Sequence, residues 1–235
     1  MQARRRVQLR ESGATVGWDE FHLALEAGTE VTYETTEQEL IGWEGEHERL
    51  AEQLDEVQGE NTEGTRQLYT DGGVQEGGRA GVYGWAVARF GPRETQGGRA
   101  GRPPVEASVR GGGRLLSHEE AVNVQRAETA ALVAGVAANV GWLASGGKLA
   151  AHVDNAGVVS AFKGLRFLKQ GREWAQLQDH DLWDVLIDVI DRTNAWERVR
   201  VYKVAAHQDT EKLEDGRPKP WKDVTLAEWG NVLAD

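Results

Sequence analysis

The pattern of apolar and polar positions changes near residue 67. Before it, the chain is polar and Glu-rich, with one stripe of residues at alternating spacings of three and four: Leu40, Trp43, His47, Leu50, Leu54 and Val57. Such spacing is typical of a single amphipathic helix. We therefore expect residues 1–66 to form an acidic leader that is partly helical or disordered, with a linker at 59–65. Residues 67–235 are expected to form a separate domain.

From residue 67 onward the pattern becomes a series of short apolar runs. Strands are predicted at 67–71, 82–90, 105–110, 149–153 and 199–204. Helices are predicted at 117–140, 155–162, 174–190 and 226–235. Ser117 and Glu120 have capping-box spacing, which indicates the start of the first helix. The first three strands would form an antiparallel meander, so the element order predicts an α/β fold with a mixed five-stranded sheet flanked by helices.

The formal charge of −11 is concentrated in the leader. Residues 1–66 contain 6 Lys or Arg and 16 Asp or Glu, whereas residues 67–235 contain 21 and 22. The domain is therefore close to neutral and has enough Lys and Arg to contact phosphates. The overall acidity does not exclude a nucleic-acid partner.

Composition narrows the kinds of site that the chain can build. There is no cysteine, so disulfides and thiolate zinc sites are excluded, and a metal would be held by oxygen or imidazole. No segment approaches the roughly 20 apolar residues of a membrane span, and residues 1–7 lack the apolar core of a signal peptide. We expect a soluble intracellular protein, nuclear or cytoplasmic, with no membrane partner.

Four acidic residues and one histidine stand at the ends of predicted strands or in predicted helices. They are Asp71 in Leu-Tyr-Thr-Asp-Gly-Gly, Glu128 in Arg-Ala-Glu, Asp154 in Val-Asp-Asn, His207 in Ala-Ala-His-Gln and Asp235 in Gly-Asn-Val-Leu-Ala-Asp. Carboxylates at strand ends and on a neighbouring helix can converge, and converging carboxylates are tolerated when divalent cations neutralise them. Each residue alone also has an ordinary explanation as a turn, surface, capping or loop residue. Together they indicate a metal-dependent phosphoryl-transfer site.

The order of these residues resembles the ribonuclease H family, whose members occur free or attached to reverse transcriptases. That family places its first Asp at a Tyr-Thr-Asp-Gly strand end, its Glu in an Arg-Ala-Glu helix and its last Asp in a Gly-Asn-x-x-Ala-Asp helix. Residues 67–235 match these segments in order, and Val-Tyr-Lys-Val-Ala-Ala-His is similar to the family's strand before the histidine loop. The resemblance implies a ribonuclease H-like fold and endonucleolytic cleavage of the RNA strand of RNA·DNA hybrids.

The resemblance also implies a cofactor and roles for the five residues. Two Mg²⁺ ions, with Mn²⁺ as a substitute, would be held between Asp71, Glu128, Asp154 and Asp235. Paired ions can activate an attacking water and stabilise the leaving 3′-oxygen. His207 would not be a ligand but would help water or product to move.

Further residues are candidates for contacts with the hybrid. Contacts with 2′-hydroxyl groups in the minor groove are assigned to Gly72, Gly73, Gln125 and Asn155. The DNA strand would be gripped by a basic stretch with an aromatic residue, comprising Arg166, Lys169, Arg172 and Trp174. Turn glycines, surface amides and a solvated basic turn are the alternative explanations for these residues.

Three features depart from the family pattern. Residues 91–104 and 111–113 lengthen the domain and are interpreted as surface insertions. Residues 211–223, before the last helix, are interpreted as a mobile insertion. Because the sequence stops at Asp235, we expect a truncated last helix whose frayed end holds a ligand poorly. We interpret the chain as a monomeric part of a retroelement polyprotein with an upstream polymerase domain.

Two other classes of function stay open. One is a catalytically weak or inactive domain of the same fold that binds hybrid or a protein partner, although the complete set of acidic residues favours the nuclease. The other is a DNA integrase or transposase, which would need a terminal Glu on the last helix in place of Glu128.

Overall fold

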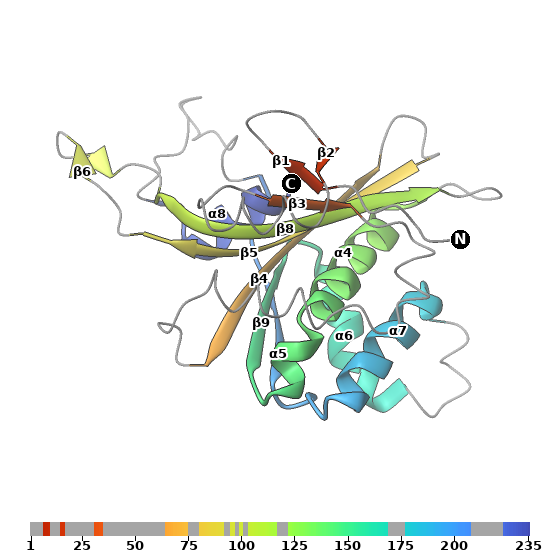
Figure 1. Ribbon diagram of the computed structural model, residues 1–235. Helices are drawn as coiled ribbons and strands as arrows, with labels where there is room; N and C mark the ends of the chain where they lie inside the picture. Colours follow the sequence, from red (N-terminus) through yellow and green to blue (C-terminus); the bar gives the residue numbers. More distant parts are fainter. Residues whose placement is uncertain are drawn as a thin grey trace.

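The computed structural model describes residues 7–9, 15–16, 31–34, 64–74, 80–91, 95–96, 99–100, 103–116, 122–168, 177–207 and 223–235. They form a mixed sheet with helices on both faces (Figure 1). Its strands are β1 (Val7–Leu9), β2 (Thr15–Val16), β3 (Val31–Glu34), β4 (Thr65–Val74), β5 (Ala80–Phe90), β8 (Val105–Leu116), β9 (Lys148–Val153) and β10 (Val199–Lys203). The helices are α4 (Val124–Ala138), α5 (Val140–Ala144), α6 (Ala156–Leu168), α7 (His180–Arg192) and α8 (Leu226–Ala234).

Five of the strands have the arrangement that the sequence predicts. In the order β10-β9-β4-β5-β8, the strands β4, β5 and β8 form an antiparallel meander, and β9 and β10 run parallel to β4. The predicted fold class is confirmed. β3 pairs in parallel with β8, and β1 and β2 continue as antiparallel strands, so leader strands extend the sheet to eight. The predicted leader helix at 40–57 lies outside the described residues.

Helix α4 begins later than the sequence pattern at Ser117 predicts. Its N-cap is Asn123, whose side-chain oxygen accepts a hydrogen bond from the backbone N–H of Arg126 at 2.8 Å, as capping residues do. The segment that contains Ser117 lies outside the described residues. The structure divides the predicted helix after Ala138, and the short helix α5 continues to Ala144, before Gly146, whose left-handed φ of 95° suits a helix terminus.

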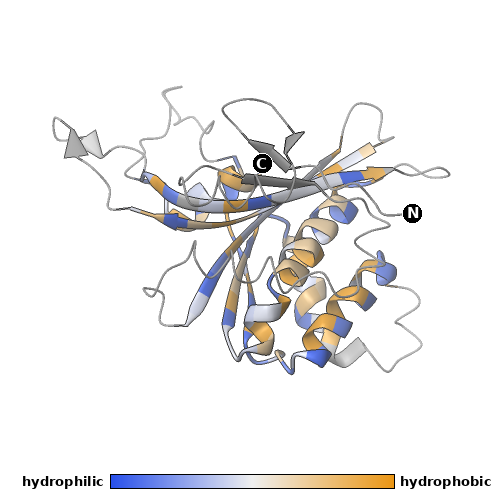
Figure 2. Cartoon of the chain, viewed as in Figure 1, coloured by the Kyte–Doolittle hydropathy of each residue, from blue (hydrophilic) through white to orange (hydrophobic). Residues whose placement is uncertain are grey.

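Small residues allow α4 to lie close to the sheet. All of its residues from Ala127 to Ala138 are buried. A Cβ atom on Gly135 would lie 2.7 Å from the side chain of Leu68 on β4 and 3.2 Å from that of Trp85 on β5. In an interior packed at crystal-like density, larger residues would push the helix away. Figure 2 shows that α4 is apolar over most of its length, whereas apolar and polar residues alternate along α7; residues of both helices belong to the same core cluster.

The two faces of the sheet carry separate apolar clusters. Adjacent residues of a strand point to opposite faces, so Leu68 contributes to the large core with α4, α6 and α7, whereas Tyr69 belongs to a smaller cluster with α8. Trp229 and Leu233 are the larger α8 residues of that cluster. The helix that carries the last predicted acidic residue therefore packs on the face opposite α4.

The interpretation of residues 111–113 as a surface insertion is wrong. These glycines form part of β8 and pair with residues 83–85 of β5. A Cβ on Gly111 would lie 2.4 Å from the indole ring of Trp85, and one on Gly112 would lie 2.6 Å from the carbonyl oxygen of Tyr83. Glycine is found here because neighbouring groups occupy the space of a side chain, which is one known role of glycine in strands.

The other predicted insertions differ in how much the structure describes. Within 91–104, the short strands β6 (Thr95–Gln96) and β7 (Arg99–Ala100) form a separate two-stranded hairpin, which projects from the main sheet (Figure 1). This agrees with an insertion at the surface. Residues 211–222 lie outside the described residues. No helix in the described part of the chain is long and apolar enough to cross a membrane.

Candidate metal centre

Three of the predicted acidic residues converge beside the carboxyl end of β9. Asp71 lies on β4, Asp154 directly follows the parallel neighbour β9, and Glu128 lies in the second turn of α4. One carboxylate oxygen from each residue lies within 4.8 Å of those of the other two. Thr70 on β4 pairs with Val153, the last residue of β9, so Asp71 and Asp154 follow at the same level, although β4 itself continues to Val74. α4 packs against β4 there, so elements distant in sequence bring these oxygens together.

Gly72 allows the close approach of α4 to β4 that this arrangement requires. A Cβ on Gly72 would lie 2.4 Å from the backbone of Ala127 and of Glu128. The backbone N–H of Gly72 donates a hydrogen bond to Asp71 Oδ1 at 2.9 Å, and it also bonds to the Glu128 carboxylate. Packing and hydrogen bonding thus explain this glycine. Its predicted contact with nucleic acid stays a prediction, as does that of Gly73.

Glu128 sits in surroundings that oppose a negative charge. Its residue surface is only 3% exposed. Burial, followed by a hydrogen bond to Asp154 and the charges of Asp154 and Asp71, raises the pKa of Glu128 to about 10. Its Oε2 atom is buried and has no hydrogen-bond partner among the described residues.

Asp71 is shifted in the same direction for similar reasons. Burial raises the pKa of Asp71 to about 7, and the charges of Asp154 and Asp235 and a hydrogen bond to the Asp235 side chain add to the effect. The Gly72 N–H opposes the shift. Like charges at short range cannot all be ionised without compensation, so the cluster holds protons near neutral pH in the absence of cations.

The donor atoms of this cluster fit a hard divalent cation. All of them are carboxylate oxygens, the ligand type that Mg²⁺ and Mn²⁺ prefer. A buried oxygen without a partner is costly unless something binds it, and a cation would fill this role at Glu128 Oε2. The same positive charge would remove the repulsion that raises the pKa values of Glu128 and Asp71.

Asp235 and His207 lie at the exposed rim of the cluster. Asp235 contacts the Asp71 side chain, and its Oδ2 atom is 4.0 Å from His207 Nδ1. The side chains of His207 and Asp235 are 66% and 59% exposed, so solvent reaches both. The structure therefore places all five predicted catalytic residues in one neighbourhood, with three carboxylates inside and two groups at its edge.

Helix α8 is attached to the sheet through its first two turns, and the expected fraying at Asp235 stays a prediction. Thr225 and Glu228 form a capping box at its start. The buried Asn231 donates a hydrogen bond from Nδ2 to the carbonyl oxygen of Thr70 at 2.7 Å. Gly230 lies against the ring of Tyr69, where a Cβ would be only 2.2 Å away. These contacts attach α8 to the strand that carries Asp71.

Two of the predicted nucleic-acid contacts lie close together at the start of α6. Asn155 Oδ1 accepts hydrogen bonds from the N–H groups of Gly157 at 2.8 Å and Val158 at 3.2 Å. A Cβ on Gly157 would lie 3.1 Å from both Asn155 Oδ1 and Gln125 Oε1. The two amide side chains therefore converge beside Gly157. Capping of α6 explains the orientation of Asn155, and its contact with substrate stays a prediction.

The predicted basic contacts are only partly described. Arg166 lies in α6, but its side chain is outside the described residues. Lys169, Arg172 and Trp174 also lie outside them. The grip on a DNA strand by this stretch stays a prediction.

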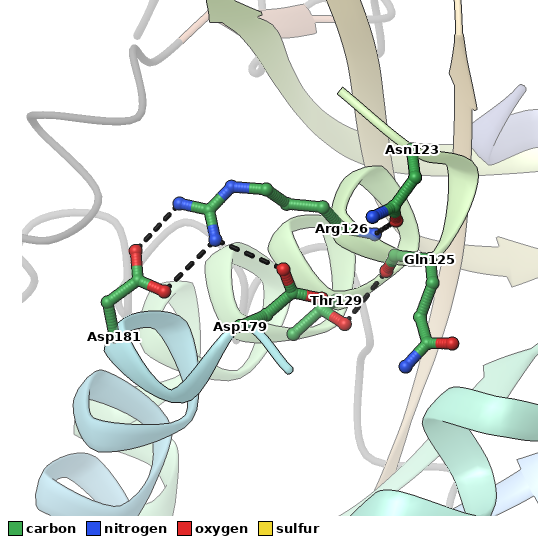
Figure 3. A network of polar contacts seen from close by, with 6 residues as sticks. All are labelled: Asn123, Gln125, Arg126, Thr129, Asp179 and Asp181. Atoms are coloured by element: carbon green, nitrogen blue, oxygen red, sulfur yellow. Dashed lines mark hydrogen bonds and ion pairs between the residues drawn. The ribbon is translucent and has the colours of Figure 1, made fainter. Parts of the chain in front are cut away.

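An ion-pair network that the sequence analysis missed connects the start of α4 to the start of α7 (Figure 3). Arg126 bonds to Asp179 Oδ1 at 3.1 Å and, through two nitrogens, to Asp181 at 3.0 and 2.6 Å. The hydrogen bond to Arg126 lowers the pKa of Asp181. Thr129 Oγ1 donates to the carbonyl oxygen of Gln125 at 2.8 Å. The Arg-Ala-Glu segment contains Arg126, but its partners are more than 50 residues away in the sequence, so no local pattern predicts the ion pairs.

Comparison with known proteins finds matches among solved structures but none among protein families or curated sequences. A scan against protein-family models finds no match, and a search of curated proteins finds no similar sequence. The solution structure of the prototype foamy virus RNase H domain is 15% identical, with a TM-score of 0.43, and the match covers 72% of this chain and 89% of that one. RNase H1 from Halobacterium salinarum is 15% identical, with a TM-score of 0.33 and coverage of 60% and 86%.

The prototype foamy virus protease-reverse transcriptase is 18% identical, with a TM-score of 0.40, and the match covers 72% of this chain but only 20% of that longer one. Independently of these matches, the order and directions of the strands β10-β9-β4-β5-β8 agree with the fold that the family resemblance of the sequence motifs implies.

Proposed function

We propose that this chain is a hybrid-specific endoribonuclease that hydrolyses the RNA strand of RNA·DNA duplexes. The observation that carries the proposal is the convergence of Asp71, Glu128 and Asp154 within 4.8 Å beside the carboxyl end of β9 in a ribonuclease H-like sheet. The raised pKa values of Asp71 and Glu128 suit a role in binding divalent cations.

Asp71, Glu128, Asp154 and Asp235 are the residues proposed to hold two Mg²⁺ ions, or Mn²⁺ in their place. The chemistry supplied by such a pair is activation of the attacking water and stabilisation of the leaving 3′-oxygen. Glu128 and Asp71 would give up their protons when cations bind, because each cation favours the ionised carboxylate. No covalent intermediate with the protein is required.

His207 is proposed to move a proton at the rim of the site. Its imidazole lies 4.0 Å from the carboxylate of Asp235 and is largely exposed. An exposed imidazole can accept a proton from one group, donate one to another and exchange protons with solvent. We propose that it assists the passage of water or product without binding a cation.

The preference for RNA is proposed to come from contacts beside the acidic cluster. The amides of Gln125 and Asn155 converge near Gly157, and amides can bond to the 2′-hydroxyl groups that distinguish RNA from DNA. The Oδ1 atom of Asn155 caps α6, so its Nδ2 group is the proposed donor to substrate. The residues from Arg166 to Trp174 would contact the DNA strand.

A cleavage assay tests the proposal. The purified chain is incubated with a labelled RNA·DNA hybrid in Mg²⁺ or Mn²⁺, beside duplex DNA, single-stranded RNA and an Asp71→Asn variant. We expect cleavage of the RNA in the hybrid alone and loss of cleavage in the variant. Intact RNA, or equal cleavage by the variant, would reject the catalytic proposal. Binding of hybrid without cleavage would favour a binding domain of the same fold.

The wider context is proposed from the sequence alone. We propose that the chain is monomeric and acts beside an upstream polymerase domain of a retroelement polyprotein. Sedimentation analysis of the purified chain tests the monomeric state.

A further inference from the structure

The end of α8 rests on a row of backbone positions that runs across the sheet from Asp71. Asp71 on β4 pairs with Gly84 on β5, and Gly84 pairs with Gly112 on β8. Ala234, the last residue of α8, lies over this row, and Asp235 follows it. The position of Asp235 therefore depends on how closely the last turn of α8 approaches Gly84.

The contact between Gly84 and α8 leaves no room for a side chain. A Cβ on Gly84 would lie 2.1 Å from the carbonyl oxygen of Ala234 and 3.3 Å from its carbonyl carbon. These are backbone atoms, so they cannot turn aside as a flexible side chain could. Gly84 is not among the positive-φ glycines of the described residues, so backbone conformation does not explain the absence of a side chain.

We propose that Gly84 is a positioning residue for Asp235, and this inference rests on the proposed function. Its missing side chain lets the last turn of α8 lie directly on β5, which places the Asp235 carboxylate beside Asp71. The Asn231 hydrogen bond to Thr70 holds the helix one turn earlier. A methyl group at residue 84 would therefore lift the end of α8 while its middle stays attached.

The expected displacement can be estimated from ordinary contact distances. A carbon and a carbonyl oxygen normally approach to about 3.3 Å, whereas the Cβ of Gly84→Ala would begin at 2.1 Å from Ala234 O. The end of α8 must then move by roughly 1 Å, and displacements of this size can reduce catalytic rates about 100-fold. The three inner carboxylates lie on β4, on α4 and after β9, not on α8, and should still bind a cation.

Two measurements test this inference together. Calorimetry measures the binding of Mg²⁺, and steady-state kinetics measure the cleavage of hybrid. For Gly84→Ala we expect the weaker Mg²⁺ binding event to lose about tenfold or more in affinity and kcat to fall by roughly 10- to 100-fold. The KM for hybrid should change less than about threefold, because the inner carboxylates and the surfaces around Gln125 and Asn155 are untouched. Unchanged Mg²⁺ binding and kcat would overturn the proposal.

A double-mutant comparison separates positioning from a general effect on the sheet. Asp235→Asn alone should weaken the same Mg²⁺ binding event, and adding Gly84→Ala should weaken it little further, because the carboxylate being positioned is already gone. If Gly84→Ala costs as much in the Asp235→Asn background as in the wild type, Gly84 does not act through Asp235. Asp235→Glu, with its longer side chain, should partly restore Mg²⁺ affinity to Gly84→Ala.

Gly112→Ala is the matched control. It lies in the same row, and the three atoms nearest to its Cβ would be Tyr83 O at 2.6 Å, Gly84 Cα at 3.4 Å and Tyr83 C at 3.6 Å, all of which belong to β5. It should lower stability while leaving both Mg²⁺ affinities within about threefold of the wild type. Loss of the weaker Mg²⁺ binding event in this variant as well would reject a specific role for Gly84.

Two further measurements keep the inference testable. If Gly84→Ala does not fold, an NMR titration of the wild-type chain replaces it. The amide signals of Gly84 and Asp235 should then shift with the same Mg²⁺ dependence, and independent shifts would reject the coupling. Failure of the wild type to cleave hybrid, with Mg²⁺ binding still sensitive to Gly84→Ala, would reject the nuclease proposal but keep the positioning role. Normal cleavage of hybrid by Gly84→Ala would reject the positioning role but keep the nuclease proposal.

Discussion

At the scale of single residues, Glu128 makes the stability of the fold depend on pH. It is a buried carboxyl group with a raised pKa and an oxygen that no described residue binds. A group whose pKa is higher in the folded than in the unfolded chain binds its proton more tightly in the folded chain. Its contribution to the free energy of unfolding therefore falls as pH rises from the lower pKa to the higher one. For Glu128 this interval runs from 4.5 to about 10, and for Asp71 from 3.8 to about 7.

The free energy of unfolding without divalent ions should therefore fall as pH rises from about 5 to 9. The slope can reach roughly 1.4 kcal/mol per pH unit for each proton that the folded state retains. Glu128→Gln, which keeps the shape and removes the charge, should flatten this slope. Urea denaturation in EDTA across the pH range measures it. A wild-type curve as flat as that of the variant would contradict the raised pKa of Glu128.

His152 should make the free energy of unfolding depend on pH in the opposite direction, below about pH 6.5. Its ring stacks between Tyr69 and Tyr202, with centroid distances of 5.2 and 5.8 Å, and its Nε2 lies 2.8 Å from Gln67 Oε1. Burial lowers the pKa of His152 to about 4. The unfolded chain therefore binds a proton first, and stability should fall as pH drops from about 6.5 to 4. His152→Phe should reduce this acid sensitivity in the same denaturation series, and an unchanged dependence would reject the assignment.

At the scale of secondary-structure elements, the Arg126 network fixes the start of α4 relative to α7. The guanidinium group makes a bidentate contact with Asp181 and a third bond to the buried Asp179. Bidentate pairs of this kind are geometrically specific. The contact lies in the first turn of α4, and Glu128 follows in the next turn.

Arg126→Lys should weaken this connection even though it preserves the charge, because an ammonium group cannot make the planar paired bonds. We expect a loss of about 1–3 kcal/mol in unfolding free energy for Arg126→Ala and a smaller loss for Arg126→Lys. A double-mutant cycle with Asp181→Asn measures the coupling between the two residues. Strict additivity would show that the pair contributes nothing to stability.

The glycines of β8 make a second prediction at this scale. Gly111→Ala would place a methyl group 2.4 Å from the Trp85 ring, and overpacking of this kind typically costs about 1–3 kcal/mol. Gly73→Ala is the control for stability, because its Cβ would lie 3.7 Å from Val82, an ordinary contact distance. Thermal denaturation of the two variants should separate them clearly. Equal stability would mean that β8 does not lie against Trp85 as described.

At the scale of the whole molecule, the parts that could be predicted are those with local signals. Alternating apolar residues identified the strands of the five-stranded core, and the order of Asp71, Glu128 and Asp154 predicted their convergence. Gly111 to Gly113 carry no apolar pattern, so a strand segment resembled a turn. The partners of Arg126 and the contact of Gly84 with α8 depend on three-dimensional packing. No local pattern in the sequence contains that information.

The leader strands give a prediction at the same scale. β3 covers the edge of β8 with parallel backbone pairing from Val31 to Glu34. A chain that begins at Gly64 should keep the five core strands but present the backbone of β8 to solvent, and open strand edges promote association. Light scattering after gel filtration should show more self-association for this shorter chain than for the full one. Equal, monomeric behaviour would mean that β3 does not protect the edge.

The pairing of β3 with β8 also makes exchange between copies possible. A strand supplied by an N-terminal segment can be replaced by the identical strand of a neighbouring molecule, since the backbone pattern that receives it is the same. Such domain swapping forms dimers at little energetic cost. High protein concentration and slow refolding would then favour intertwined pairs that dilution alone separates only slowly.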